Sequence, residues 1–169
     1  MGTHRRTVSE ILAGHKDAPY DPELREFIEQ IASALYERHE HFPQWPESVQ
    51  FFYACYDLNY QVGNGGFAQA AYNVPQLIPV AQKAFESFGR SEAASLCKEA
   101  LSRLPAELAE HLAKGFTGDE SLEDVFKHFS ESDMADLDER IPKEFWADEQ
   151  LQDLVQKNRK DFESVDDNG

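Results

Sequence analysis

Two adjacent glycines, Gly65 and Gly66, interrupt an otherwise apolar and helical part of the chain. The stretch before them is dense in aromatic and aliphatic residues: Val49, Phe51, Phe52, Tyr53, Cys55, Tyr56, Leu58 and Tyr60. The stretch after them resumes a helical pattern: Phe67, Ala70, Ala71 and Tyr72. Glycine destabilises a helix interior, so we expect it only where the backbone needs a positive φ angle or a close approach that a Cβ atom would block. The sequence therefore predicts a sharp corner between two helices, with Asn64 as the N-cap of the second.

The rest of the chain also has helical spacing. Apolar residues recur three and four positions apart over residues 24–35, 77–88 and 94–104, and prolines or glycines separate these stretches. No segment alternates apolar and polar residues in the way that strands do. The sequence therefore predicts an all-α fold, a single compact multi-helix domain whose central helix, from about residue 47 to residue 61, is aromatic-rich.

The two ends of the chain set the expected domain boundaries. Residues 1–20 lack a sustained period, and only Val8, Ile11 and Leu12 are spaced to form a short docking helix. We therefore expect a partly irregular N-terminal arm over residues 1–20 and a single helical domain over residues 21–165. With 169 residues, the chain is long enough to bury a hydrophobic core.

The charge of the chain is its most unusual quantity. It has 32 acidic and 16 basic residues, which gives a formal net charge of −16. Because 41% of its residues are hydrophobic, the chain is not a disordered acidic tail. Residues 86–169 hold 22 of the acidic and 10 of the basic residues. This imbalance opposes direct binding to nucleic acid or to an anionic membrane, and it favours a basic protein partner.

The richest acidic stretch supplies the candidate partner-binding residues. They are Asp119, Glu120, Glu123, Asp124, Glu131, Asp133, Asp136, Asp138 and Glu139. Apolar residues at helical spacing lie among them, so we expect the carboxylates to be fixed on helices and to face water. Carboxylates three or four residues apart on a helix are about 5–6 Å apart at Cβ, and each DNA strand has a phosphate roughly every 3.4 Å of axis. Such pairs could imitate DNA phosphates, although a solvated acidic face is the commoner outcome.

Catalytic and metal chemistry have little support in the sequence. The segment His39-Glu40-His41 suggests metal ligands, but no second cluster at suitable spacing follows it. Asparagine and glutamine side chains lie near the glycine corner, but no His, Cys, Ser or acid–base pair at the spacing of a catalytic motif accompanies them. We therefore expect no catalytic residue, no metal and no cofactor.

Cys55 and Cys97 fall in apolar helical patterns, and the sequence contains no secretory or membrane-spanning segment. Together these observations indicate a reduced, cytoplasmic protein.

The corner also carries a resemblance. Asn64-Gly65-Gly66-Phe67, followed by Gln69 and Tyr72-Asn73, resembles the signature of a bacterial family of small acidic helical proteins, a domain of unknown function whose namesake is a double-stranded-DNA mimic protein. The likeness extends from about Leu35 to the C-terminal helix. It implies a DNA-mimic role for the chain, but it assigns no role to the signature positions: Asn64, Gly65, Gly66, Phe67, Gln69 and Asn73.

Three functions follow from these observations. The first is a non-enzymatic acidic protein that occupies the basic DNA-binding surface of a partner such as a transcription regulator. The second, with the same electrostatics, is an immunity-type inhibitor of a basic toxin nuclease. The third is a small-ligand binder that uses the side-chain amides of the Asn64–Gln69 corner. Homodimerisation stays open, because nothing in the sequence identifies an interface.

Overall fold

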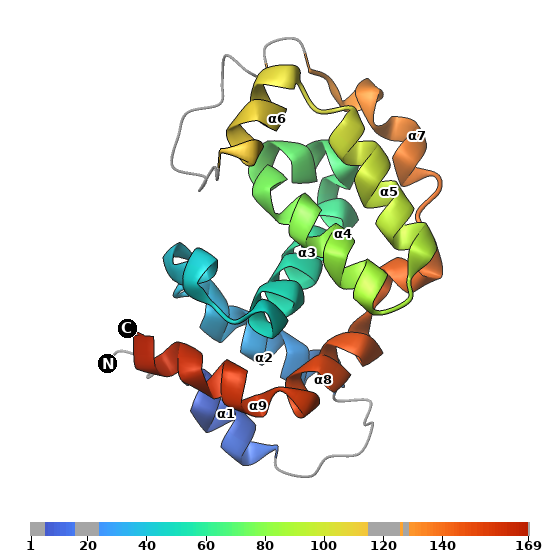
Figure 1. Cartoon of the computed structure of the whole chain (residues 1–169). Coiled ribbons are helices and arrows are strands. Elements are labelled where there is room, and N and C mark those ends of the chain that lie inside the picture. Colours follow the sequence, from blue (N-terminus) through green and yellow to red (C-terminus); the bar gives the residue numbers. More distant parts are fainter. Residues whose placement is uncertain (1–5, 16–23, 115–125, 127–128, 169) are drawn as a thin grey trace, which may run out of the picture. The chain divides into compact units, whose positions relative to one another are not determined.

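The computed structural model describes residues 6–15, 24–114, 126 and 129–168 (Figure 1). Within these ranges the chain forms helices and no strand, which confirms the predicted all-α class. The α-helices are α1 (Val8–Gly14), α2 (Leu24–Tyr36), α3 (Glu47–Asn73), α4 (Ile78–Ser87), α5 (Ser91–Ser102), α6 (Ala106–Ala113), α7 (Ala135–Asp138), α8 (Asp148–Lys157) and α9 (Arg159–Glu163). The 3-10 helices are η1 (His39–Gln44), η2 (Pro75–Leu77), η3 (Glu131–Asp133), η4 (Lys143–Trp146) and η5 (Ser164–Asn168). No helix among the described residues is long and apolar enough to cross a membrane.

The chain divides into two compact units. The first consists of residues 1–53 and 147–169, and the second of residues 54–146. Helix α3 contributes its first seven residues to the first unit and the remainder, including the glycine corner, to the second. The predicted division into an arm over residues 1–20 and one domain over residues 21–165 stays a prediction.

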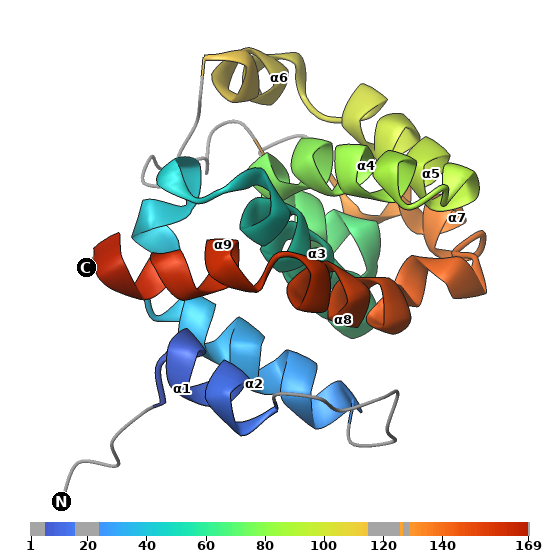
Figure 2. The same ribbon diagram turned by 60° about the horizontal axis from the view of Figure 1, so that its bottom comes forward.

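In the first unit, the predicted N-terminal docking helix is α1, which packs against α2 and α9 (Figure 2). Its apolar residues Val8, Ile11 and Leu12 are at most 3% exposed. A helix of seven residues is unstable alone, because it makes few hydrogen bonds for the entropy it loses. The tertiary contacts of its buried face therefore hold it in place.

At each end of α1, a charged side chain binds the backbone: a carboxylate at the N-terminal end and a guanidinium at the C-terminal end. The Asp166 carboxylate accepts hydrogen bonds from the backbone N–H groups of Val8 (3.3 Å) and Ser9 (2.7 Å). At the other end, the Arg159 guanidinium donates to the carbonyl of Leu12 (2.6 Å). These contacts satisfy backbone groups that have no partner inside the helix, and their charges oppose the helix dipole.

In the second unit, α4 and α5 run side by side (Figure 1), and three buried phenylalanines form an aromatic part of the core. Phe67, Phe85 and Phe145 are fully buried, and the Phe145 ring centroid lies 5.6 Å from that of Phe67 and 5.3 Å from that of Phe85. Trp146, which follows Phe145 directly, is not part of this core, because its side chain is 43% exposed. Pro142 separates α7 from η4, so the buried residues of these elements do not share one helix stripe.

Cys55 and Cys97 are both buried in the second unit and form no disulfide, as the sequence predicts. Burial raises the pKa of the Cys55 thiol well above its ordinary value, and the neighbouring Cys97 adds to this effect. Burial also raises the pKa of Cys97 to about 12. Since the thiolate is the nucleophile, both groups are unreactive in the folded state and act as small apolar side chains.

Replacing the carboxylate that caps α1 tests this account of the first unit. We expect Asp166→Ala to lower the free energy of unfolding by roughly 1–2 kcal/mol, because two N–H groups of α1 and the Ser9 hydroxyl lose their acceptor and Arg38 loses its ion pair. Urea unfolding followed by circular dichroism measures the loss. The neighbouring Asp167 is exposed, so Asp167→Ala is the matched control and should change stability by less than about 0.5 kcal/mol. Equal effects of the two substitutions would contradict the capping role.

Candidate functional site

The glycine corner lies inside α3 and breaks it into two helical segments. Gly65 and Gly66 have non-helical backbone angles, and Gly66 has φ +74° and ψ −174°. A Cβ atom built on Gly66 would lie 2.6 Å from Cγ of Asp138, which is closer than real contacts allow. Both expected reasons for the glycines, a positive φ and a close approach, are therefore confirmed at Gly66. The N-cap prediction for Asn64 is wrong, because two non-helical residues separate Asn64 from the second segment, which begins at Phe67.

Asp138, far along the chain, supplies the acceptor that the start of the second segment needs. The backbone N–H of Phe67 donates to Oδ1 of Asp138 at 2.8 Å, across 71 residues of sequence. The first N–H groups of a helix have no partner within the helix, and the helix dipole favours a negative charge beside them. Asp138 thus caps the second segment of α3 from outside.

Three of the side-chain amides near the corner bind one another. Gln69 Nε2 donates to Oε1 of Gln61 at 3.0 Å, and Asn73 Nδ2 donates to the same oxygen at 2.9 Å. In a straight helix, residues eight and twelve apart would be separated by about 12 and 18 Å along the axis. These bonds therefore require the sharp change of direction at the glycines. The Gln69 side chain also lies over Gly65, where a Cβ atom would be 2.9 Å from Cδ of Gln69.

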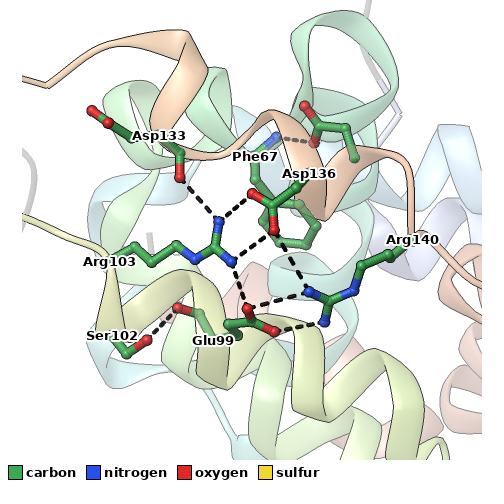
Figure 3. A network of polar contacts seen from close by, with 8 residues as sticks. Phe67, Glu99, Ser102, Arg103, Asp133, Asp136 and Arg140 are labelled. Atoms are coloured by element: carbon green, nitrogen blue, oxygen red, sulfur yellow. Dashed lines mark hydrogen bonds and ion pairs between the residues drawn. The ribbon is translucent and has the colours of Figure 1, made fainter.

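An arginine-centred ion network lies beside this corner in the same unit (Figure 3). Arg103, the residue that directly follows α5, pairs with Asp136 of α7, and it donates to Oε1 of Glu99 at 2.5 Å. Arg140 donates to Oε2 of Glu99 at 2.6 Å and lies 3.7 Å from Oδ2 of Asp136. Arg103 also donates to the backbone carbonyl of Asp133 at 3.1 Å. The network joins the segment around α7 to α5.

The network changes the acidity of its two carboxylates. The hydrogen bond from Arg140, and then that from Arg103, holds the pKa of Glu99 below its ordinary value. The hydrogen bond from Arg103 likewise lowers the pKa of Asp136. Both groups therefore stay ionised at neutral pH and neutralise the two arginines, so neither carboxylate presents its full charge to solvent.

The predicted partner-binding acids divide into three groups. Asp119, Glu120, Glu123 and Asp124 lie outside the described residues. Asp136 and Asp138 are engaged inside the unit, as described above, and the Asp133 carboxylate accepts a hydrogen bond from Ser130 N–H at 2.8 Å. Glu131 and Glu139 are exposed and have no ion pair among the described residues.

Sequence reasoning missed the arginines and several further surface acids. Arg103 lies four residues after Glu99, and Arg140 four after Asp136, which is the spacing of helical ion pairs. The spacing indicates the pairs Glu99–Arg103 and Asp136–Arg140, but it does not show that the two pairs meet and form one network. Among the residues that the structure describes, the remaining exposed acids of the second unit lie on its helices: Glu86, Glu92, Glu107 and Glu110.

The sequence places most of the net charge after residue 86, but the fold distributes it evenly. Each of the two units contains 16 acidic and 8 basic residues, a formal charge of −8. The reason is that the acidic C-terminal segment from Ala147 onward belongs to the first unit. Neither unit is the acidic half of the protein.

The histidines expected to be poor metal ligands have other contacts. Nδ1 of His39 lies 2.8 Å from the carbonyl oxygen of Tyr36, and the two rings stack with centroids 5.2 Å apart. His41 lies 3.7 Å from Glu40. Over the part of the chain that the structure describes, no group of three or more His, Cys, Asp or Glu residues is arranged to hold a metal ion.

The chain matches a known protein family. A family model described as DMP19-like protein matches residues 43–164, which is most of the chain and includes the corner and the ion network. Searches of curated proteins and of solved structures find no match.

The corner makes a direct prediction for glycine replacement. We expect Gly66→Ala to lower the free energy of unfolding by roughly 3–5 kcal/mol, because it combines a positive φ with a clash against Asp138. Gly89 has a similar φ of +71° but no atom within 4 Å of the site of a Cβ, so Gly89→Ala isolates the backbone term and should cost roughly 1–2 kcal/mol. Chemical denaturation of both variants measures the difference. Equal costs would show that Asp138 does not lie against Gly66.

The ion network predicts a pH-dependent stability. The lowered pKa values of Glu99 and Asp136 stabilise the fold above their ordinary values of 4.5 and 3.8, and this stabilisation is lost as the pH falls through the lower folded values. Arg103→Gln should therefore destabilise the protein at about pH 6, and the difference from the native protein should shrink toward about pH 3. Thermal unfolding over this range measures it. Lys157→Gln, which removes an exposed pair with Asp153 in the first unit, is the control and should show a much smaller pH dependence.

Proposed function

The chain belongs to the DMP19-like protein family, and we propose that it is a non-enzymatic interaction protein that imitates double-stranded DNA. Its carboxylates would occupy the basic DNA-binding surface of a partner protein, such as a transcription regulator. A net charge of −16 supports a basic partner, because it repels nucleic acid and anionic membranes and attracts lysine- and arginine-rich surfaces.

The observation that carries this proposal is an acidic segment fixed on a helical support. Residues 129–140 are joined to α5 by Arg103 and to the glycine corner by Asp138. Leu137 within the segment is fully buried. Glu131 and Glu139 remain exposed on this support. A mimic needs such fixed carboxylates, because a partner that reads phosphate positions gains little from charges that move independently.

The surface acids of the second unit extend the same pattern. Glu107 and Glu110, both exposed, lie three residues apart on α6, which places their Cβ atoms about 5–6 Å apart. We propose that these residues act with Glu131 and Glu139 in contacting the partner. Asp136 contributes less, because Arg103 and Arg140 already neutralise it.

The contacts at the corner argue against a small-ligand site there. Gln61, Gln69 and Asn73 use their amides on one another, and the Phe67 N–H is bonded to Asp138. A ligand would have to replace these internal bonds, which lowers its net gain. We therefore assign the corner to the support of the acidic surface.

Affinity capture from the native cell at about 50 mM and about 500 mM salt tests the proposal, followed by titration of the purified partner. We expect the partner to be a basic DNA-binding protein, its binding to weaken steeply with salt, and duplex DNA to compete with this chain. A non-basic partner, or an affinity that neither salt nor DNA changes, would contradict the proposal. A basic toxin nuclease whose inhibition does not depend on its DNA-binding surface would do the same.

Charge substitutions locate the surface. We expect Glu131→Gln combined with Glu139→Gln to weaken binding of the captured partner roughly 3- to 30-fold, mostly through slower association. Glu40→Gln combined with Glu149→Gln removes the same charge from exposed positions of the first unit and is the matched control. Equal losses from the two double substitutions would mean that the partner responds to net charge and not to this surface.

A further inference from the structure

We propose that the glycine corner is an internal carboxylate receptor for Asp138, and that Asp138 is a positioning residue of the acidic surface and not one of its partner-binding acids. The corner residues would then set where the segment 129–140 lies, instead of binding a ligand of their own. The consequence for partner binding rests on the proposed function, whereas the positioning itself does not.

The receptor is built from a helix start and an absent side chain. The N–H of Phe67 points to Oδ1 of Asp138 at 2.8 Å, and Gly66 leaves the space that the other carboxylate oxygen occupies. Any other residue at position 66 would fill that space with its Cβ atom and would also resist the φ of +74°. Gly66 therefore both shapes the turn and admits the carboxylate.

The remaining signature residues hold the receptor together. Phe67 is fully buried against Phe145, which fixes the start of the second segment in the core. The bonds of Gln69 and Asn73 to Gln61 fix the angle between the two segments of α3. Gly65 allows the Gln69 side chain to cross close to the backbone. Asn64 is exposed, and no contact seen in the described residues gives it a part in this arrangement.

Two anchors then hold the acidic segment on either side of one buried residue. Asp136 pairs with Arg103 at the C-terminal end of α5, Leu137 is buried in the core, and Asp138 enters the corner. The side chains of these three consecutive residues are engaged by Arg103, by the core and by the corner, and the next residue, Glu139, is exposed. The direction of Glu139 thus follows from the anchoring of its neighbours.

Hydrogen exchange of the full-length chain, followed by mass spectrometry, tests the inference. We expect Asp138→Ala to accelerate exchange in peptides that cover residues 64–73 and 129–141 by roughly fivefold or more, because the segment loses one anchor. Glu139→Ala removes the adjacent, exposed carboxylate and should leave both regions unchanged. Unchanged exchange in Asp138→Ala, or an equal acceleration in Glu139→Ala, would overturn the inference.

A measurement on the native protein decides the question if Asp138→Ala fails to fold. The Phe67 amide is the first of its helical segment, a position that ordinarily exchanges fast because it has no partner within the helix. Its bond to Asp138 should slow its exchange, seen by NMR, to the rates of amides in the middle of a helix. Exchange as fast as that of an unbonded amide would overturn the inference.

Partner binding separates this inference from the proposed function. Faster exchange in Asp138→Ala together with weaker binding of the captured partner supports both. Faster exchange with unchanged binding supports the receptor and contradicts the role of the segment in binding. Unchanged exchange overturns the receptor, whatever the binding assay gives.

Discussion

Helix starts that need an acceptor organise this protein. The N–H groups at the start of a helix have no internal partner, and here carboxylates from the C-terminal part of the sequence accept their hydrogen bonds. Asp138 serves the second segment of α3, and Asp166 serves α1. Glu144 serves α5, accepting from the N–H groups of Glu92 (3.1 Å) and Ala93 (3.3 Å). Each bond joins segments at least 51 residues apart, so these caps also fix the tertiary arrangement within each unit.

This use of carboxylates changes how the acidic composition is interpreted. A count of acidic residues treats all of them as surface charge, yet Asp138, Glu144 and Asp166 face helix ends and Asp136 faces two arginines. The number of carboxylates free to contact a partner is therefore smaller than the composition implies, and their positions are fewer. The acids that remain exposed beside the anchored ones, such as Glu131 and Glu139, lie at positions set by these internal contacts.

Local patterns in the sequence were enough to predict the helices, and tertiary contacts explain what they could not. Periodicity identified α2, α4 and α5, and the cost of glycine in a helix predicted the backbone of Gly66. Asn64 was the nearest capping residue in sequence, but the cap came from Asp138, 71 residues beyond Phe67. Likewise, helical spacing indicates that Asp136 and Asp138 lie near other acids, but only the tertiary positions of Arg103 and Phe67 determine which groups these two carboxylates bind.

A chain of net charge −16 must limit the repulsion between its acids if it is to stay folded. In this protein some carboxylates bind helix starts or arginines, and others are exposed to solvent. A carboxylate bonded to a helix start or to an arginine stabilises the unit and removes one repulsive charge from the surface. Glu131 and Glu139 have no ion pair with another described residue, and the contacts of their neighbours hold the segment that carries them. Different members of one acidic segment therefore stabilise the unit and carry its exposed charge: Asp136 and Asp138 do the first, and Glu131 and Glu139, the acids that we propose contact a basic partner, do the second.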